Sequence, residues 1–296
     1  MENYRTDLAV EIMNKIGGAR EGAEVESADG RGGTKINRVR ITSEAAARDI
    51  GKPIGNYHTV DYVELDSETY EYREEISKDI AAEIDMVAGG IREKKYETVL
   101  VAGLGNRDMT ADALGSYVCE RIFVTRHIKA EIPELLEDGS LGVAVIAPGV
   151  FGVTGIETEE VITSVSKRIE ADLVVLIDSL AALEPRRIGT SVQISDTGII
   201  PGSGVGNKRT PLNSRTLGAD VIAIGVPMVT YATTIAKDAS GLERLDETMM
   251  KKYENMVVTP KNIDEIVEKS AETLAMAIDR AINPGVARDF IELIRR

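Results

Sequence analysis

From Glu97 to Pro227 the sequence alternates short apolar runs, each the length of one strand, with longer segments whose apolar residues recur at helical spacing. Such alternation predicts right-handed β-α-β crossovers and a mostly parallel central sheet with helices on both faces. We therefore expect an α/β fold. The runs that predict strands are VLVA, GVAVIAPG, DLVVLIDSL, TSVQISD and DVIAIGVP.

The regions on either side of this alternation have a different character. Residues 1–33 combine a short helical pattern with a stretch rich in glycine and acids, which predicts a mobile arm followed by a loop. Residues 34–42 and 57–66 alternate apolar and polar side chains, so they predict a strand-rich extension whose two strands pair near one edge of the sheet. After Pro227 the chain is predicted to be helical to its end, with Asn262 as the N-cap of the longest helix.

Composition excludes several classes of protein. The 296 residues, 43% of them hydrophobic, can bury a large core, and the net charge of −14 argues against direct nucleic-acid binding. No apolar run is long enough to span a membrane, and the N-terminus has no signal-peptide pattern, so we expect a cytoplasmic protein. The lone cysteine, Cys119, lies in an apolar-periodic segment and is predicted to be a core residue.

The first candidate site follows the strand VLVA. The turn GLGN at residues 103–106 needs small residues, Thr110 is a predicted N-cap, and Asp112 would lie in the first turn of a helix running to about residue 128. This places a carboxylate at the carboxyl end of a strand, where ligands of open α/β sheets bind. The alternative is an ordinary strand-to-helix turn. A dinucleotide-binding loop is disfavoured because Asp108 or Met109 stands where the third glycine is needed.

The second candidate is Asp178, which follows the apolar run at residues 174–177. A strand buried on both faces would end there, at a position equivalent to that of the GLGN turn. Neighbouring strands that end in this way can bring Asp112 and Asp178 together. An aspartate at a strand end is often only a helix cap, so its position alone leaves both interpretations open.

The third candidate is the glycine-rich segment at residues 194–213, which predicts a long ordered loop or a flap. A flexible surface connection is the alternative. Lys208 and Arg209 within it could form an anion site, although an exposed basic pair is usually only solvated.

Taken together, the motifs closely resemble those of the spore germination protease family, whose members degrade small acid-soluble spore proteins during germination. The resemblance runs from about Arg5 to Val229 and resumes around residues 257–264. The family's fold is similar to that of hydrogenase-maturation proteases, which share the GLGN-type turn but use carboxylates to hold nickel. The matching segments are GLGNRDMTADALG, TRH, PGVFGVTGIET, IDSLAAL, QISDTGIIPGSGVGNKR and IGVPMV.

The resemblance implies an aspartic-type endopeptidase with no cofactor or metal, in which Asp112 and Asp178 are the two catalytic aspartates. It also implies a homotetramer that acts on small acid-soluble spore proteins in the spore core and binds neither nucleic acid nor membrane. If one carboxylate of such a pair keeps a proton, the other can activate water, and the predicted helix start favours Asp112 as the ionised one. Substrate-binding residues would be Gly103, Gly105, Asn106, Gly202, Gly204, Gly206 and Asn207.

A separate prediction concerns cleavage of the N-terminus. Family members remove a short propeptide, and RTDLAVE resembles the start of the mature chain, so we predict self-cleavage between Asp7 and Leu8. Residues 1–7 would be the propeptide and residues 8–296 a single α/β peptidase domain. The residues without the resemblance favour a frayed end at 1–7, in which Asp7 stabilises the start of the first helix.

The sequence leaves two alternative functions open, and it differs from the family pattern at two places. The chain could be a metal-dependent peptidase of the maturation type, with Asp112, Asp178 and His127 as ligands, or a non-catalytic peptide-binding protein. The segment at residues 240–257 is shorter than expected for the family. Tyr231 stands where an acid would be usual, which puts a third acidic group at the site in doubt.

Overall fold

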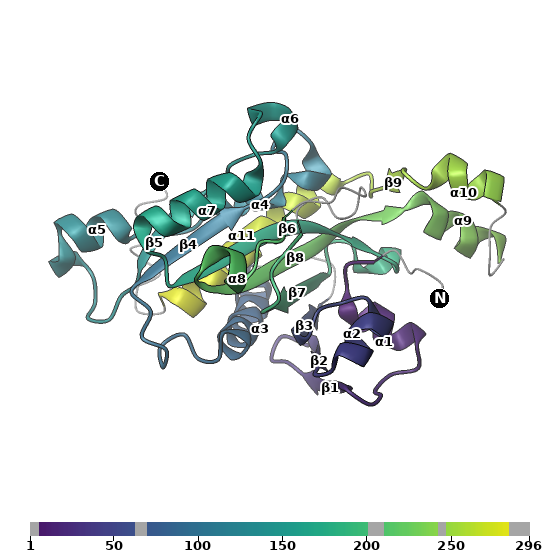
Figure 1. Ribbon diagram of the computed structural model, residues 1–296, viewed down its shortest axis with the longest axis horizontal. Helices are drawn as coiled ribbons and strands as arrows, with labels where there is room; N and C mark the ends of the chain where they lie inside the picture. Colours follow the sequence, from purple (N-terminus) through teal and green to yellow (C-terminus); the bar gives the residue numbers. More distant parts are fainter. Residues whose placement is uncertain (1–5, 63–69, 201–209, 242–246, 284–296) are drawn as a thin grey trace.

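The computed structural model describes residues 6–62, 70–200, 210–241 and 247–283. Within these residues, one sheet has the strand order β1-β2-β3-β7-β8-β6-β4-β5, and β9 pairs with β8 (Figure 1). The strands are β1 Ala23–Asp29, β2 Lys35–Ile41, β3 Gly55–Asp61, β4 Thr98–Gly103, β5 Gly142–Ile146, β6 Leu173–Ala182, β7 Ser191–Ser195, β8 Asp220–Tyr231 and β9 Val257–Val258.

The sheet has a parallel and an antiparallel part. Strands β5, β4, β6 and β8 are parallel neighbours, whereas β1, β2, β3, β7 and β8 pair antiparallel. The α/β fold and the strand-rich N-terminal extension are therefore confirmed, including the predicted pairing of β2 with β3. Strand β1 was not predicted, because its side chains are mostly solvent-facing and acidic, as suits an exposed sheet edge.

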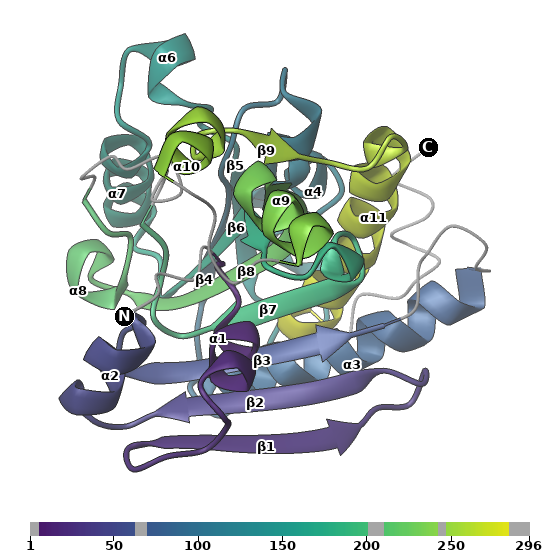
Figure 2. The same ribbon diagram turned by 90° about the vertical axis from the view of Figure 1, so that its right-hand side faces the viewer.

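Helices cover both faces of the sheet (Figure 2). Helices α3, α4 and α11 pack together on one face, and α7 and α8 pack on the other. The long predicted helix after Asn262 is confirmed, although the Asn262 side chain makes no capping hydrogen bond. The helices are α1 Ala9–Lys15, α2 Glu44–Ile50, α3 Tyr70–Ala88, α4 Leu114–Cys119, α5 Arg126–Glu131, α6 Phe151–Thr154, α7 Thr158–Ile169, α8 Ser214–Leu217, α9 Ala232–Ser240, α10 Glu247–Tyr253 and α11 Ile263–Ile282.

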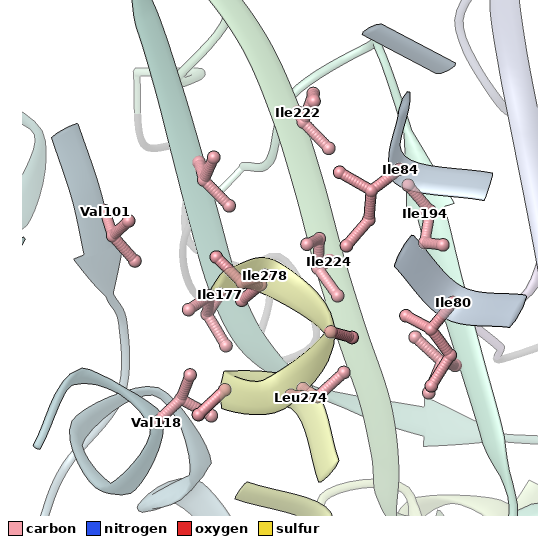
Figure 3. Close-up of a cluster of buried hydrophobic side chains, with 14 of the residues drawn as sticks. Ile80, Ile84, Val101, Val118, Ile177, Ile194, Ile222, Ile224, Leu274 and Ile278 are labelled. Atoms are coloured by element: carbon pink, nitrogen blue, oxygen red, sulfur yellow. The ribbon is translucent and has the colours of Figure 1, made fainter. Parts of the chain in front are cut away.

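The main core lies between α3, α4, α11 and the sheet. Ile177 and Ile224 of neighbouring strands face Leu274 and Ile278 of α11 (Figure 3). Each of these side chains has no exposed surface, and burying one such side chain contributes about 1.5–3 kcal/mol. This packing holds Ile177, the residue before Asp178, against α11 at the end of β4. Cys119 is buried, as predicted.

The N-terminal helix corrects one prediction. Residues 8–13 were expected to belong to a mobile arm, but they are buried, and α1 packs with α2 against β2 and β3. Leu8 and Met13 are both fully buried, so the apolar side chains of this segment are covered by the body of the protein. From Thr6 on, the start of the chain is therefore part of the folded structure.

The predicted helix from Asp112 to about residue 128 is also wrong. A short 3₁₀ turn at Thr110–Asp112 precedes α4, and the chain leaves helical geometry before α5. Thr125, which is fully buried, redirects the chain because its hydroxyl donates to the Leu141 carbonyl and accepts from the Val143 N–H. These side-chain bonds tie the chain to β5 in place of a continued helix.

A buried charged cluster joins the N-terminal strands to α3. Glu83 of α3 accepts hydrogen bonds from Arg38 of β2 at 2.7 and 2.9 Å and lies 2.6 Å from His58 Nδ1 of β3. Burial raises the pKa of Glu83, but the bonds to Arg38 and His58 outweigh it and bring the pKa down to about 2. The carboxylate is thus ionised and paired.

Within the described part of the chain, no helix is long and apolar enough to cross a membrane.

Candidate functional site

The site lies where β4 ends and β6 continues. The last pair between these strands joins Gly103 to Ile177, and Leu104 N–H still donates to the Ile177 carbonyl at 2.8 Å. Asp178 is the next residue of β6, so it lies just beyond the end of β4. The prediction that the strand itself ends at Asp178 is wrong, because β6 runs on to Ala182 paired with β8.

The turn after β4 holds Asp112 at the carboxyl end of that strand. Gly105 has φ +101°, and a Cβ there would lie 2.0 Å from the Asp112 carbonyl oxygen, so this position requires glycine. Asn106 N–H donates to Asp112 Oδ2 at 2.8 Å. Thr110 is not an N-cap, since it begins the 3₁₀ turn whose cap is Met109. A backbone amide of the GLGN turn therefore orients the carboxylate, and no helix start does.

Asp112 and Asp178 interact electrostatically. Burial, the charge of Asp112 and the charge of Asp7 together raise the pKa of Asp178 from 3.8 to about 8, and the Ser179 N–H opposes the shift. Burial also raises the pKa of Asp112, against the hydrogen bond from Asn106. At neutral pH the Asp178 carboxyl therefore holds a proton, as expected when like charges share a buried site.

A third carboxyl comes from the N-terminal segment. Asp7 N–H donates to the Ala181 carbonyl at 2.9 Å, and Ala181 N–H donates to Asp7 Oδ2 at 2.8 Å. Because β8 pairs with β6 here through Val229, Asp7 occupies the edge that β4 has left. The sequence predicted Asp7 only as a cleavage position. Tyr231, at the position where the family has an acid, instead pairs with Val257 of β9.

The peptide bond between Asp7 and Leu8 is held at both polar ends. The Asp7 carbonyl accepts hydrogen bonds from Gln193 Nε2 at 2.8 Å and from Lys52 Nζ at 3.0 Å. Leu8 N–H donates to Thr6 Oγ1 at 3.1 Å. The other end of the Gln193 amide accepts the Ala9 N–H at 2.7 Å. No pattern in the sequence pointed to Lys52 or Gln193, which lie far apart along the chain.

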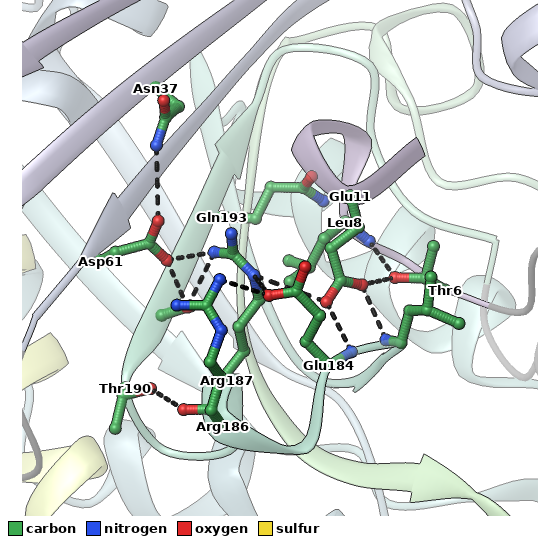
Figure 4. A network of polar contacts seen from close by, with 12 residues as sticks. Thr6, Leu8, Glu11, Asn37, Asp61, Glu184, Arg186, Arg187, Thr190 and Gln193 are labelled. Atoms are coloured by element: carbon green, nitrogen blue, oxygen red, sulfur yellow. Dashed lines mark hydrogen bonds and ion pairs between the residues drawn. The ribbon is translucent and has the colours of Figure 1, made fainter. Parts of the chain in front are cut away.

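Glu11 anchors the same segment (Figure 4). Its carboxylate accepts the Leu183 N–H at 2.7 Å, the Glu184 N–H at 2.8 Å and the Thr6 hydroxyl, and it lies 3.5 Å from Arg187 Nε. Burial raises the pKa of Glu11, and these partners lower it. Residues 6–11 therefore lie along residues 181–184, which are the end of β6 and the two residues after it, beside the aspartate pair.

The remaining predicted site residues fall into two groups. Gly103 has a packing role, because a Cβ there would lie 2.1 Å from the Gly115 carbonyl oxygen. The glycine-rich segment is described only at its ends, where Ile199 and Leu212 exchange two backbone hydrogen bonds. The predicted substrate-binding residues Gly202, Gly204, Gly206 and Asn207, and the basic residues Lys208 and Arg209, lie outside the described residues.

His127 is separated from the aspartates. It belongs to α5, which starts beside the first residues of β5, whereas Asp178 lies beyond the last residue of β4. β4 and β5 are parallel, so α5 with His127 lies at the amino ends of these strands and the aspartates lie at the carboxyl end of β4. Over the described ranges, no three His, Cys, Asp or Glu side chains gather in an arrangement that could hold a metal.

The structure is an α/β protein with two interacting, half-buried carboxyls at the carboxyl end of a central strand, which is an arrangement suited to acid–base chemistry. Sequence comparison then gives the family. The family model described as germination protease matches residues 9–243, and this chain belongs to that family. It is therefore a peptidase of the germination protease family, as the motifs predicted.

Relatives support the same assignment over nearly the whole chain. A germination protease of Clostridium perfringens is 37% identical over 323 aligned residues, covering 98% of each chain. That of Caldanaerobacter subterraneus subsp. tengcongensis is 39% identical, covering 95% of each chain. That of Bacillus cereus is 42% identical over 242 residues, covering 80% of this chain and 65% of the relative.

Among solved structures, the comparison found the nickel–iron hydrogenase maturation protease HycI of Thermococcus kodakarensis KOD1. The match has a TM-score of 0.34 and 21% identity, covering 62% of this chain and 94% of that one. Similarity of this degree carries no conclusion about metal binding or chemistry.

Proposed function

We propose that this chain is an aspartic-type endopeptidase of spore germination whose catalytic groups are Asp112 and Asp178. The observation that carries the proposal is the electrostatic interaction of the two carboxyls at the carboxyl end of β4, with Asp178 protonated at neutral pH. Perturbed carboxyls in such a position are candidates for acid–base work. Family membership supplies the reaction class, which is peptide-bond hydrolysis.

The chemistry follows from the two protonation states. Ionised Asp112 takes a proton from water as the water oxygen bonds to the peptide carbonyl carbon, while the Asp178 proton is shared with the carbonyl oxygen. The tetrahedral intermediate then collapses, the C–N bond breaks, the amine nitrogen leaves with the proton that Asp112 took from water, and Asp178 recovers its own proton as the C=O bond re-forms. The Asn106 N–H keeps the Asp112 carboxylate oriented throughout.

We further propose that the chain is a zymogen that cuts itself between Asp7 and Leu8. This is supported by the contact of Asp7 with residue 181 of the strand that carries Asp178. It is also supported by the charge of Asp7, which is among the causes of the raised Asp178 pKa. Residues 1–7 would then be the propeptide.

The substrates proposed are small acid-soluble spore proteins, and the proposed working form is a homotetramer in the spore core. Both are carried over from the family resemblance in the motifs. The net charge of −14 fits protein substrates better than direct nucleic-acid contact.

The test is intact-mass analysis of the full-length chain, alone and with a small acid-soluble spore protein, with and without a chelator. We expect loss of residues 1–7 and substrate cleavage, both insensitive to chelator and both absent in Asp112→Asn and Asp178→Asn. The matched control is Asp138→Asn, which changes an exposed aspartate on a loop. Turnover in either site variant would refute the carboxyl pair, and loss of turnover with chelator would favour the metal-dependent alternative.

A further inference from the structure

The most unusual contacts outside the aspartate pair are those of the Asp7 carbonyl. We propose that Lys52 and Gln193 form an oxyanion-binding pair that stabilises negative charge on the Asp7 carbonyl oxygen while the Asp7–Leu8 bond is cut. The inference rests on the proposed self-cleavage and goes beyond it by assigning two further catalytic residues.

The geometry fits such a pair. Gln193 Nε2 and Lys52 Nζ donate to one carbonyl oxygen at 2.8 and 3.0 Å, within the range of good hydrogen bonds. They come from separate elements, since Gln193 is on β7 and Lys52 follows α2. Two donors that converge on the oxygen of an acyl group are the usual construction of an oxyanion site.

Gln193 is held in place before any reaction. Its Oε1 accepts the Ala9 N–H and its Nε2 donates to the Asp7 carbonyl, so both ends of the side-chain amide are fixed. The side chain is only 8% exposed and stands on a strand paired with both β3 and β8. A donor fixed in this way needs no reorganisation when charge develops on the oxygen.

Desolvation of the Lys52 ammonium costs free energy that its hydrogen bond to the neutral Asp7 carbonyl does not recover. Burial lowers the pKa of the Lys52 ammonium, and the charge of Asp7 only partly opposes this effect. A partly desolvated cation gains little from a neutral carbonyl, but it gains much more from the full negative charge of a tetrahedral intermediate. The lysine is thus better matched to the transition state than to the uncut peptide.

The bond changes balance without any further reactant. The water oxygen bonds to the Asp7 carbonyl carbon as one water proton passes to the Asp112 carboxylate, and the carbonyl π electrons move onto the oxygen that faces Lys52 and Gln193. When the C=O bond re-forms, the C–N bond breaks and the Leu8 nitrogen takes the proton that Asp112 received from the water. The Thr6 hydroxyl, which accepts the Leu8 N–H, fixes the orientation of that nitrogen.

Three variants test the pair by the rate at which the full-length chain loses residues 1–7. Gln193→Glu keeps an oxygen for the Ala9 N–H but replaces the donor to the Asp7 carbonyl by a second acceptor. Lys52→Met keeps chain length and removes the cation. We expect each of these two to cut about 100-fold more slowly or worse, and Lys52→Arg, which keeps a cationic donor, to stay within about tenfold of the wild type.

Hydrogen exchange of the amides at residues 8–13 separates catalysis from anchoring. We expect the slow variants to keep the protection of the wild-type chain, because Asp7, Glu11 and the buried Leu8 still hold the segment. Cutting within about threefold of the wild-type rate, or slow cutting together with lost protection, would overturn the oxyanion assignment. The proposed self-cleavage itself fails in a different way, by an uncut wild type or by an Asp112→Asn chain that still cuts.

Discussion

Replacing Asp178 by asparagine should stabilise the protein, and the gain should grow with pH. The folded pKa of Asp178 is about 8, well above 3.8, so the folded state holds a proton that the unfolded state releases. Stability therefore falls as pH rises from about 4 to about 8, because the unfolded state binds fewer protons. Asparagine cannot ionise, so it avoids this loss.

The size of the effect follows from the shift. A difference of about four pKa units corresponds to about 5–6 kcal/mol at 1.36 kcal/mol per unit. Asp178 is only partly buried and shares the site with Asp112 and Asp7, so solvent screening reduces the expected gain to about 2–3 kcal/mol. The gain should be complete above pH 8 and absent near pH 4.

Urea unfolding at several values between pH 4 and pH 9 measures the difference in unfolding free energy between the variant and the wild type. Intact mass before and after each series shows whether the wild type has lost residues 1–7, and only series in which both chains keep these residues are compared. Asp138→Asn, on an exposed loop, controls for the general effect of removing a negative charge. A difference independent of pH, or a variant less stable than the wild type at pH 9, would refute a protonated Asp178.

Three further outcomes are expected. Gly105→Ala should lower stability by about 2–3 kcal/mol and abolish peptide cleavage, because its Cβ would collide with the Asp112 carbonyl; thermal unfolding and a cleavage assay check this. Glu83→Gln should lower stability by about 3 kcal/mol at pH 7 and by nearly nothing at pH 2, since the benefit of a pKa near 2 is present above pH 4.5 and lost as pH falls through 2; equal losses at both pH values would contradict the ion cluster. Self-cleavage should slow above about pH 8 as Asp178 loses its proton, and again at acid pH as Asp112 gains one; a rate that rises steadily through pH 9 would argue against this assignment.

The sequence predicted the α/β alternation and both aspartates because these depend on local pattern. Apolar runs of strand length identify β4 and β6. An aspartate that follows each run lies at the carboxyl end of β4, on the same side of the sheet's parallel strands. The length of β6 beyond Asp178 was not predictable, because it depends on pairing with β8, a contact distant in sequence. The break before α5 was missed for a similar reason, since Thr125 bonds to residues that follow it only after a long connection.

The N-terminal segment was the largest error. Its glycines and acids indicate disorder when they are read locally, yet Glu11 is 1% exposed and accepts two backbone N–H groups from residues 183 and 184. A buried carboxylate of this kind gives no signal in a single sequence, because its partners are main-chain amides. The contacts of Lys52 and Gln193 were missed on the same grounds, and Asp7 was predicted only as a cleavage position.

The docking of residues 6–11 along residues 181–184 has a consequence for the timing of activity. A tethered occupant competes at an effective concentration on the order of millimolar, so an uncut chain would exclude protein substrates present at lower levels. Hydrolysis at Asp7–Leu8 would separate Thr6 and Asp7 from the rest of the chain, so they would lose this effective concentration. The retained chain would begin with an ammonium group on the fully buried Leu8, where an unpaired charge is strongly disfavoured, so one hydrolytic event would both release the inhibitor and weaken the docking of the residues that follow it.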